Sequence, residues 1–567
     1  MTAHTDTNDL SLTGRRWLWP DNTASQHVGL PGFLSAILTR RGVVAAGEIE
    51  RYFSPSLSTL DDPMQMADMP LAAERILRAI REHEPIVVYG DYDVDGVCST
   101  AILVTFLRVA GAKTSFYIPD RRTEGYGLNV AAVHELAPIC KLLVTVDCGI
   151  SANPEVELAR SLGIDVIVVD HHQVPTPLPP SIANLDPHRP DCAYPFKDLC
   201  AAGVTFMLTA ALRRTLRDQG AFATVPEPDI REFLDLVALA TVADMVPLKG
   251  TNRTLVAAGL KRMAANERLG LEALFEVSGV NPKEVTATDL GFRIGPRINA
   301  RGRMSQAGEA VDLLLTDDPD RARMLAAALD SANRQRRELE SETLEAASSL
   351  ATTLLAENRA ALVLYDPTWH PGVLGLVATR LVTRFHRPAI VIGENGKGSG
   401  RTFEGLDLHA AIEAVGHLLE RFGGHPAAAG ITVRADKVAE FSAAFDCEVR
   451  RRLGDPPFVP TLKPDVEVAA QELSLSMLGQ IEKLAPFGQA NPEPLFVARR
   501  LKVRDKRLVG DKHLKLRLGG LDAIAFGLGD LARRVPDEVD VAFHLTRNRY
   551  NGRESLQLKV EDLKPSS

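Results

Sequence analysis

Short apolar runs alternate with helix-length segments between residues 85 and 190. The runs are IVVYG at 86–90, TSFYI at 114–118, LLVTV at 142–146 and IDVIVV at 164–169. Buried runs rich in β-branched residues, separated by helices, are typical of βαβ units that form a parallel sheet with helices on both faces. We therefore predict a doubly wound α/β domain.

Helical patterns follow this predicted sheet. Residues 230–245 and 253–278 are expected to be helices that complete the domain or join it to the next one. No glycine occurs between Gly308 and Gly372, and Asp317 and Asp318 followed by Pro319 form a suitable helix start. Sustained a/d heptads are missing, so we predict a long helix that bridges two domains and not a coiled coil.

The C-terminal third predicts two further structures. ALVLY at 361–365 and PAIVI at 388–392 are expected strands, with helices at 372–385 and 407–421, which makes a second α/β unit. A proline-rich linker lies between about 450 and 465, as judged from its turn-forming residues. The last hundred residues or so alternate short strands with NG- and GD-type turns, which predicts a small β-barrel.

Composition sets limits on the class of protein. The chain has 567 residues, which is too long for one core, because single cores stop growing near roughly 250–300 residues. A hydrophobic content of 45% with 24% charged residues is ordinary for globular domains. There is no apolar run of about 18 residues and the start is polar, so we expect a cytoplasmic protein without a signal peptide. The six cysteines show no CxxC spacing and are expected to be reduced thiols.

The net charge of −8 at first argues against a polyanionic partner. However, residues 495–567 contain sixteen Lys and Arg against ten Asp and Glu, and 499–518 is the densest basic segment. On an oligonucleotide-binding barrel this segment would contact backbone phosphates, whereas on an ordinary barrel it would be a solvated edge. Few aromatic residues lie nearby, so we expect phosphate contacts to dominate over stacking.

Acidic residues and histidines stand where the predicted strands end. Asp91, Asp93 and Asp95 follow the first strand, Asp147 follows LLVTV, and Asp170, His171 and His172 follow IDVIVV. The carboxyl ends of parallel strands form one rim of a sheet, so these side chains are expected to converge. Asp244, after an apolar helix, could add another carboxylate. Oxygen and imidazole ligands suit Mn²⁺ or Mg²⁺, and two ions about 3.5–4 Å apart suit displacement at phosphorus.

Each of these motifs alone has a simpler interpretation. A DxDxDG run is also found in calcium-binding loops and solvated turns, an Asp at a strand end is often a helix N-cap, and adjacent histidines are often surface residues. Three successive strands that all end in metal-type ligands favour a metal centre.

The motifs resemble those of a known superfamily. DYDVDG at 91–96, VDCG at 146–149, DHH at 170–172 and ADMVPL at 243–248 are similar to the motifs of the DHH phosphoesterases. The resemblance extends from about residue 30 to 565. It includes further strings, among them GPRINARGRM at 295–304, FGGHPAAAG at 422–430 and APFGQANPEPLF at 485–496. These strings point to the bacterial exonucleases specific for single-stranded DNA. The resemblance implies five parts: an N-terminal segment (1–80), a DHH catalytic domain (81–316), a connecting helix (317–357), a DHHA1 substrate-binding domain (358–452) and an OB-fold nucleic-acid-binding domain (453–567).

The same resemblance implies roles for individual residues. Asp93, Asp95, Asp147, His171 and Asp244 would hold two Mn²⁺ or Mg²⁺ ions, with Asp147 between them and Asp91 as a further candidate ligand. Asp170 would support the site, and His172 would face the scissile phosphate. Arg121 would hold the 5′ phosphate, Tyr126 would pack near the terminal base, and Arg303 would reach the scissile region. Ser399, Arg401 and His425, beside two glycine-rich segments interpreted as turns, would contact the substrate across a cleft. Val94, Cys148 and Arg301 depart from the usual pattern.

The implied activity is 5′→3′ degradation of single-stranded DNA to 5′-mononucleotides. The implied role is in DNA recombination and repair, including recombinational and mismatch repair. The protein would be a monomer that works with a single-stranded-DNA-binding protein and a helicase. Two alternatives stay open. One is a phosphodiesterase of short oligonucleotides or cyclic dinucleotides, and the other is an inactive DHH-type binding protein of replication.

Overall fold

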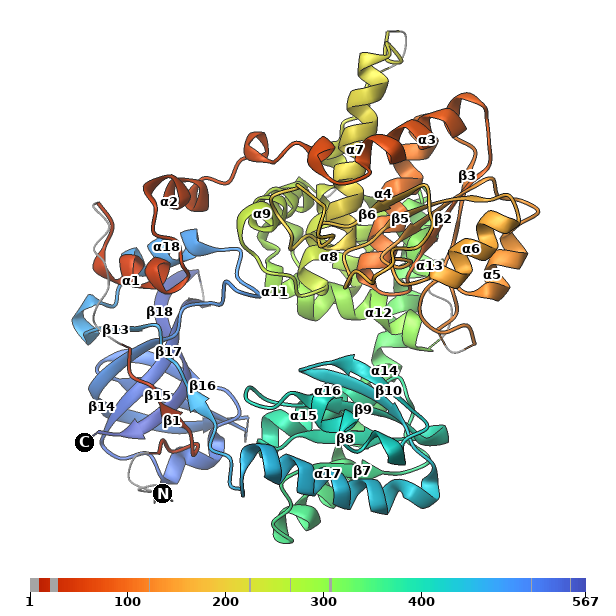
Figure 1. Cartoon of the computed structure of the whole chain (residues 1–567). Helices are drawn as coiled ribbons and strands as arrows, with labels where there is room; N and C mark the ends of the chain where they lie inside the picture. The colour runs from red at the N-terminus through yellow and green to blue at the C-terminus, as the bar shows by residue number, and fades with distance from the viewer. Residues whose placement is uncertain are drawn as a thin grey trace. The chain divides into compact units, whose positions relative to one another are not determined.

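The computed structural model describes residues 10–20, 29–121, 123–223, 226–265, 267–304, 308–510, 512–550 and 552–566, without the side chains of 301–304 and 550 (Figure 1). The chain divides into two compact units. One comprises Ala24–Asn333 with Gly479–Glu493, and the other comprises Met1–Thr23, Arg334–Leu478 and Pro494–Ser567. The domain boundaries inferred from the sequence stay predictions. Among the described residues, no helix is both long and apolar enough to cross a membrane.

A parallel sheet forms the centre of the first unit. Its strands are β2 (Ile86–Gly90), β3 (Thr114–Tyr117), β4 (Leu142–Val146), β5 (Asp165–Val169) and β6 (Ala183–Leu185), in the order β3-β2-β4-β5-β6. All neighbouring pairs are parallel. The four predicted strands are therefore confirmed, and β6 is a short addition at the edge beyond β5.

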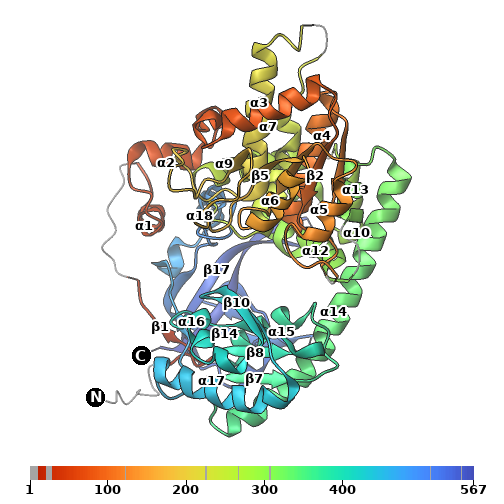
Figure 2. The same cartoon turned by 45° about the vertical axis from the view of Figure 1, so that its right-hand side comes forward.

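Helices cover both faces of this sheet. On one face, α3 (Met69–Arg81), α4 (Val94–Val109), α7 (Ala201–Asp218) and α8 (Leu234–Ala243) pack against Val88, Val144 and Ile167. On the other face, α5 (Val130–Leu136) and α6 (Asn153–Ser161) pack against Val87, Leu143 and Val168. Figures 1 and 2 show the two helical layers with the sheet between them. Both faces of each inner strand are buried, which is why the strands read as continuous apolar runs. The doubly wound fold is confirmed.

Further helices complete the first unit. They are α1 (Gly32–Arg40), α2 (Ala46–Phe53), α9 (Gly250–Ala265), α10 (Leu269–Ser278), α11 (Ala287–Asp289), the π-helical turn η6 (Leu290–Ile294), α12 (Gly295–Met304) and α13 (Gly308–Leu315). The buried Arg253 on α9 joins the distant segment 479–493 to this unit, because its guanidinium donates hydrogen bonds to the carbonyl oxygens of Leu484 (2.9 Å) and Ala485 (2.8 Å).

The predicted long helix is α14 (Pro319–Ala356), with 38 residues. Asp318 caps it, since its Oδ1 accepts hydrogen bonds from the amides of Asp320 and Arg321.

A mixed sheet lies in the second unit. Its strands are β7 (Leu362–Tyr365), β8 (Ala389–Ile392), β9 (Lys397–Arg401), β10 (Arg421–His425) and β11 (Ala428–Thr432), in the order β10-β11-β9-β8-β7, and β7–β8 is the parallel pair. The helices of this α/β domain are α15 (Leu374–Phe385), α16 (Leu408–Glu413) and α17 (Val438–Leu453).

Two local predictions in this domain are wrong. In the glycine-rich segment 393–401, only Glu394–Gly396 form a turn and Lys397–Arg401 are strand β9. Gly423, Gly424 and His425, expected to form a second turn, belong to strand β10. Glycine is required in β9 by packing, because a Cβ on Gly398 would lie 2.8 Å from Ile431 Cγ1. The helix expected at 407–421 ends at Glu413, and the chain enters β10 at Arg421.

The C-terminal strands close into a barrel. They are β14 (Phe496–Val509), β15 (His513–Leu518), β16 (Leu521–Ala525), β17 (Glu538–Tyr550) and β18 (Arg553–Pro565), and pairing of β14 with β17 closes the ring. The short β13 (Val466–Glu467) adds to β14, β1 (Arg16–Trp17) pairs with β12 (Thr461–Leu462), and α18 (Leu475–Ile481) precedes the barrel. Phe496 and Phe543 stack in the interior. The predicted OB-type barrel is confirmed.

Candidate metal centre

The carboxyl ends of three adjacent strands carry the acidic residues. Asp91 follows β2, Asp147 follows β4 and Asp170 follows β5. The amide of Asp147 donates to Val169 O, so the sheet ladder continues to the residue that leaves it. Asp147 then takes a left-handed backbone conformation with φ of 62°. Aspartate tolerates this region better than most residues do, and the turn directs the chain away from the sheet at that point.

The DYDVDG loop is fixed by its own side chains. Asp93 is the N-cap of α4, where its Oδ1 accepts hydrogen bonds from the amides of Asp95 and Gly96. A Cβ on Gly96 would lie 2.5 Å from the carbonyl oxygen of Asp91, so only glycine fits there. Asp95 is fully buried, and its carboxylate accepts from the first two amides of α7, at 2.7 and 2.8 Å.

Asn299 is a supporting residue that the sequence reasoning missed. Its Oδ1 accepts a hydrogen bond of 3.1 Å from the amide of Val94, between Asp93 and Asp95. Asn299 lies within the motif GPRINARGRM, of which Arg301 and Arg303 were considered, and its contact with Val94 across 205 positions is not visible in the local pattern. The side chains of Arg303 and Arg301 lie outside the described residues.

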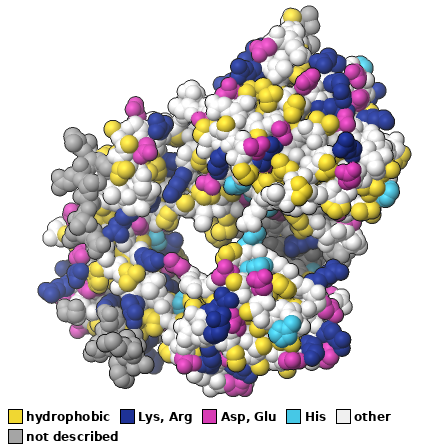
Figure 3. Space-filling model, viewed as in Figure 1, with side chains coloured by type: hydrophobic (Ala, Val, Ile, Leu, Met, Phe, Trp, Pro, Cys, Tyr) yellow, Lys and Arg dark blue, Asp and Glu magenta, His cyan; other side chains and the backbone are white. Residues whose placement is uncertain are grey.

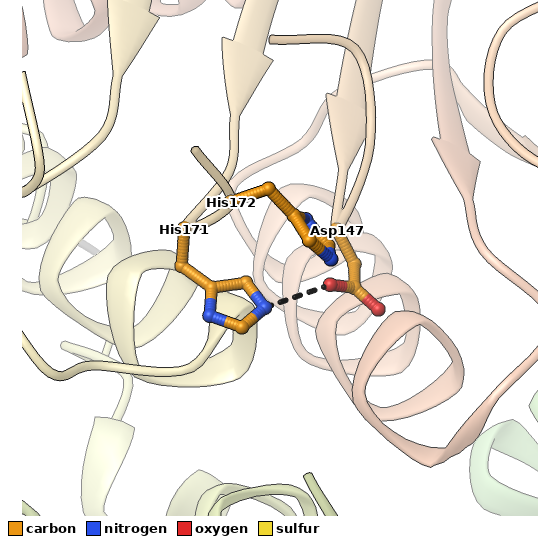
Figure 4. A group of neighbouring side chains, drawn as sticks. All are labelled: Asp147, His171 and His172. Atoms are coloured by element: carbon orange, nitrogen blue, oxygen red, sulfur yellow. Dashed lines mark ion pairs between the residues drawn. The ribbon is translucent and has the colours of Figure 1, made fainter. Parts of the chain in front are cut away.

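The predicted ligands meet around one imidazole nitrogen. His171 Nε2 lies 3.3 Å from Asp147 Oδ1, 3.7 Å from Asp95 Oδ2 and 3.7 Å from Asp244 Oδ2. Figure 4 shows the Asp147 carboxylate directed at this nitrogen. Asp244 is the C-cap residue of α8, as predicted from the apolar helix before it. Ligand atoms lie within 4.8 Å of one another in three groups: Asp147, His171 and His172; Asp95, His171 and Asp244; Asp91, Asp93 and Asp147.

The electrostatics of this cluster favour a bound cation. Burial and the neighbouring Asp93 raise the pKa of Asp91 to about 8, and burial and Asp95 raise the pKa of Asp244 to about 8. The pKa values of Asp95 and Asp147 are raised as well, first by burial. His171 Nε2 and Asp91 Oδ1 are buried without a hydrogen-bond partner. Buried carboxylates that repel one another, together with an unpaired imidazole nitrogen, fit Mn²⁺ or Mg²⁺.

Asp170 and His172 form a separate pair beside the ligands. His172 Nδ1 lies 2.7 Å from Asp170 Oδ1, and the other Asp170 oxygen accepts from the amide of Ile150. Burial of the ring lowers the pKa of His172, but the bond to Asp170 outweighs this effect and the pKa rises to about 9. His172 is therefore an imidazolium near neutral pH. Asp170 is occupied by this pair and is not in any of the three ligand groups.

Arg121 and Tyr126 border the cluster. The Arg121 guanidinium lies 5.1 Å from the centre of the Tyr92 ring, within the DYDVDG loop. The Tyr126 hydroxyl donates to Asp147 O at 3.2 Å and lies 3.4 Å from His172 Nδ1. Tyr126 is nevertheless 54% exposed. Both residues are therefore available to a ligand beside the carboxylates.

The unusual residues leave the cluster intact. The Val94 side chain is 1% exposed and packs toward α12, and Cys148 is fully buried behind Asp147. All six cysteines are free thiols, as predicted.

In the second unit, three predicted substrate contacts share one sheet. Arg401 on β9 and His425 on β10 both pair with Ala428 of β11, which lies between these two strands. The two side chains are therefore carried at the same end of the sheet. Ser399 lies two residues before Arg401 on β9. Burial lowers the pKa of Arg401, which forms no ion pair with a described carboxylate. A Cβ on Gly375 would lie 2.9 Å from its Nη2, so the guanidinium packs against the start of α15. An unpaired cation beside a helix N-terminus suits an anion.

The predicted basic segment of the barrel forms β14 and β15. Lys502, Arg504 and Arg507 on β14 are exposed, whereas Arg499 is paired with Glu467. Figure 3 shows Lys and Arg side chains over the visible face of the barrel.

Family models match three parts of the chain. Residues 85–241 match the N-terminal domain of the DHH family, 358–451 match the DHHA1 domain and 464–562 match the RecJ OB domain.

Curated relatives are similar over nearly the whole chain. The single-stranded-DNA-specific exonuclease RecJ of Dickeya dadantii is 40% identical, with 94% of this chain and 96% of that protein covered. The corresponding protein of Escherichia coli is 39% identical, with 96% and 98% covered. The crystal structure of RecJ in complex with Mn²⁺ from Thermus thermophilus is similar with a TM-score of 0.81 at 33% identity, over 95% of this chain and 76% of that one. A second structure from that organism holds Mg²⁺, with a TM-score of 0.76 at 31% identity over 95% of this chain and 75% of that one.

Proposed function

The chain belongs to the RecJ family of single-stranded-DNA-specific exonucleases, and from this premise we propose that the carboxylates around His171 form its catalytic metal centre. The protein is a metal-dependent exonuclease of single-stranded DNA, with a role in DNA recombination and repair. One observation carries the assignment of the site. His171 Nε2 is buried without a hydrogen-bond partner, and three carboxylates lie within 3.7 Å of it.

Asp93, Asp95, Asp147, His171 and Asp244 would hold two divalent ions, with Asp147 shared between them and Asp91 as a further ligand. Asp147 belongs to two groups of ligand atoms, one with His171 and His172 and one with Asp91 and Asp93, which supports its role as the shared ligand. When bound, the ions activate a water and neutralise charge on the phosphate. The protein fixes the ligands beforehand, through the amides of α7 on Asp95 and the bond from Val94 to Asn299.

His172 would act on the phosphate as a cation and proton donor. Its raised pKa supports this role, because an imidazolium at neutral pH can bind a phosphate oxygen and donate a proton to the leaving 3′ oxygen. Asp170 orients the ring through Nδ1 and stabilises its positive charge. This pair would therefore position the scissile phosphate.

Arg121 and Tyr126 would bind the 5′-terminal nucleotide. A guanidinium beside the ligands can bind a terminal 5′ phosphate with two hydrogen bonds, and the exposed Tyr126 ring can contact the first base. This arrangement supports 5′→3′ polarity with release of 5′-mononucleotides. Arg303 would reach the scissile region.

Replacement of Arg121 by alanine is expected to reduce the preference for 5′-phosphorylated ends. Loss of one charge-assisted contact costs about 1.5–3 kcal/mol, so kcat/KM on a phosphorylated oligonucleotide should fall about 10- to 100-fold. The rate on the same strand with a 5′ hydroxyl should change little. Arg81→Ala is the control, since this arginine bonds to Gln219 and not to the loop. Equal losses on both ends would contradict the assignment.

Ser399, Arg401 and His425 would contact phosphates of the bound strand. The half-buried Arg401 guanidinium supports this proposal, because its described hydrogen bond goes to the carbonyl oxygen of Gly400 and not to a carboxylate. The cleft between this domain and the DHH domain stays a prediction.

The barrel is expected to bind the backbone in a salt-dependent manner. Removal of two phosphate contacts by the double substitution of Arg504 and Arg507 with alanine should lower the slope of log affinity against log salt by about 1.4. Fluorescence anisotropy with a single-stranded oligonucleotide in EDTA would measure the slope. Arg231→Ala is a matched control, because Arg231 is exposed and paired with Asp229 in the first unit. An unchanged slope would contradict binding at β14.

One experiment separates the activity from its two alternatives. Degradation with Mn²⁺ is compared on single-stranded DNA, duplex DNA, dinucleotides and cyclic dinucleotides. A preference for long single strands is expected, because the barrel adds a binding surface that a dinucleotide cannot use. Faster cleavage of dinucleotides would favour the small-substrate enzyme, and absence of cleavage would favour the binding protein.

The monomeric state, the cytoplasmic location and the partnership with a single-stranded-DNA-binding protein and a helicase also belong to this proposal. The resemblance to the family supports the partners, whereas the cytoplasmic location is expected from the apolar pattern of the sequence. Size-exclusion chromatography and co-purification would check them.

A further inference from the structure

Two exposed apolar side chains are carried by segments next to the metal centre: Met245 follows Asp244, and Phe292 lies on a turn that packs against the helix before Asp244. Met245, the residue after this carboxylate, is 68% exposed and has a left-handed backbone with φ of 59°. Phe292 is 80% exposed. Single exposed apolar residues are common on protein surfaces. These two differ from scattered surface residues. Met245 lies in the segment that carries a predicted ligand, and Phe292 lies in a segment that packs against it.

The position of Phe292 follows from the π-helical turn Leu290–Ile294 and the start of α12. A Cβ on Gly295 would lie 3.5 Å from Ala243 Cβ and 3.8 Å from Val94 Cγ2. Ala243 precedes Asp244, and Val94 stands between two further predicted ligands. The start of α12 therefore packs against both ligand-bearing segments, and the turn itself packs against α8, since a Cβ on Gly291 would lie 3.5 Å from Val242 Cγ1. π-helical turns frequently occur at functional sites.

Tyr126 and Met245 adjoin different carboxylates of the ligand cluster. The Tyr126 hydroxyl contacts Asp147, and Asp147 and Asp244 each approach His171 Nε2, at 3.3 and 3.7 Å. Met245 continues the chain from Asp244. A strand with its first phosphodiester bond at the ligands and its terminal base near Tyr126 would therefore leave past Met245 and the neighbouring π-helical turn.

We propose that Phe292, on the π-helical turn that packs against the end of α8, stacks against the nucleobase on the 3′ side of the scissile phosphate. The inference rests on the proposed function, which places the 5′-terminal nucleotide at Arg121 and Tyr126. An aromatic ring can stack on any base, because every base has a π-face, so the contact suits an exonuclease that must accept all sequences. A base inside a duplex is already stacked on its neighbours, so the same contact favours unpaired strands.

The test is a thermodynamic cycle between Phe292 and the base. Cleavage of 5′-phosphorylated oligonucleotides with Mn²⁺ is measured for the wild-type protein and Phe292→Ala, each with a normal or an abasic second nucleotide. Stacking on one base is worth about 1–3 kcal/mol, so Phe292→Ala should raise KM about 5- to 100-fold on the normal strand with little change in kcat. The abasic nucleotide should raise the KM of the wild-type protein similarly and that of Phe292→Ala little further.

The controls separate stacking from a structural role. Phe292→Tyr keeps the ring and should retain the wild-type KM, and Val109→Ala removes an exposed apolar side chain at the end of α4 without effect. If the abasic nucleotide raises KM equally in the wild-type protein and Phe292→Ala, the base does not stack on Phe292 and the proposal is overturned. A lower unfolding temperature of Phe292→Ala with an unchanged KM would show that another segment covers the ring, which also overturns it. If the wild-type protein does not cleave the normal strand, the proposed function fails first.

Discussion

Asp147→Ala is expected to abolish the nuclease activity while the protein stays folded. Asp147 belongs to two of the three groups of ligand atoms and approaches His171 Nε2 at 3.3 Å. Loss of a shared ligand would remove several kcal/mol of transition-state stabilisation, which corresponds to a decrease in kcat of about 10³-fold or more. Release of mononucleotides from a labelled single strand with saturating Mn²⁺ measures the effect.

The same substitution should not destabilise the metal-free protein. Burial and the charges of Asp95, Asp93, Asp91 and Asp244 raise the pKa of Asp147, so its removal relieves repulsion. Alanine is strained in the left-handed conformation of residue 147, which offsets part of this relief. The unfolding temperature in EDTA should therefore stay close to that of the wild-type protein, and affinity for single-stranded DNA in EDTA should be retained. Asp229→Ala, at an exposed ion pair, is the control with full activity. Retained cleavage by Asp147→Ala would remove Asp147 from the catalytic site, and a clear loss of stability would mean that lost activity reports unfolding.

The convergence of the acidic residues could be predicted from the sequence because strand ends are local signals. A run such as LLVTV followed by Asp147 indicates both a buried strand and the side chain at its carboxyl end, and the parallel order of the strands then brings these ends together. Asp244 was also predictable, since its apolar helix ends directly before it.

The supporting contacts could not be predicted in the same way, because they depend on packing between distant segments. The amides of Ala201 and Ala202 bind Asp95 across 106 and 107 positions, and Asn299 binds the amide of Val94 across 205. Nothing in the local pattern specifies these pairs.

Glycine was misleading for a related reason. In isolation, KGSGR suggests a turn, because glycine permits turn conformations that other residues avoid. In β9 the glycines are needed for another purpose, since Ile431 and Ile392 occupy the space that a side chain at Gly398 would take. Such a role depends on neighbouring strands and is not visible along the chain.

The stability of the metal-free protein is expected to fall as pH rises, and bound metal is expected to abolish this dependence. Asp91 and Asp244 have pKa values of about 8 in the folded state, against an ordinary value of 3.8. The folded protein therefore holds these protons more tightly than the unfolded chain does, and it loses stability as pH rises from about 4 to about 8. His172 acts in the same direction, because its pKa is raised from 6.5 to about 9 and the stability that its proton provides is lost as pH rises from about 6.5 to about 9.

Divalent ions should compensate this loss most strongly at high pH, because the carboxylates must be deprotonated to coordinate them. A metal at 100 times its dissociation constant adds about 2.7 kcal/mol, which corresponds to an increase in unfolding temperature of about 5 °C. Unfolding is measured by scanning fluorimetry at about pH 6 and about pH 8.5, in EDTA and in Mn²⁺, and the stabilisation should be larger at the higher pH. Asp244→Asn removes one of the raised carboxyl groups and should weaken the pH dependence in EDTA. A metal-free protein that becomes more stable from pH 6 to 8.5 would contradict the repulsion between carboxylates on which the metal assignment depends.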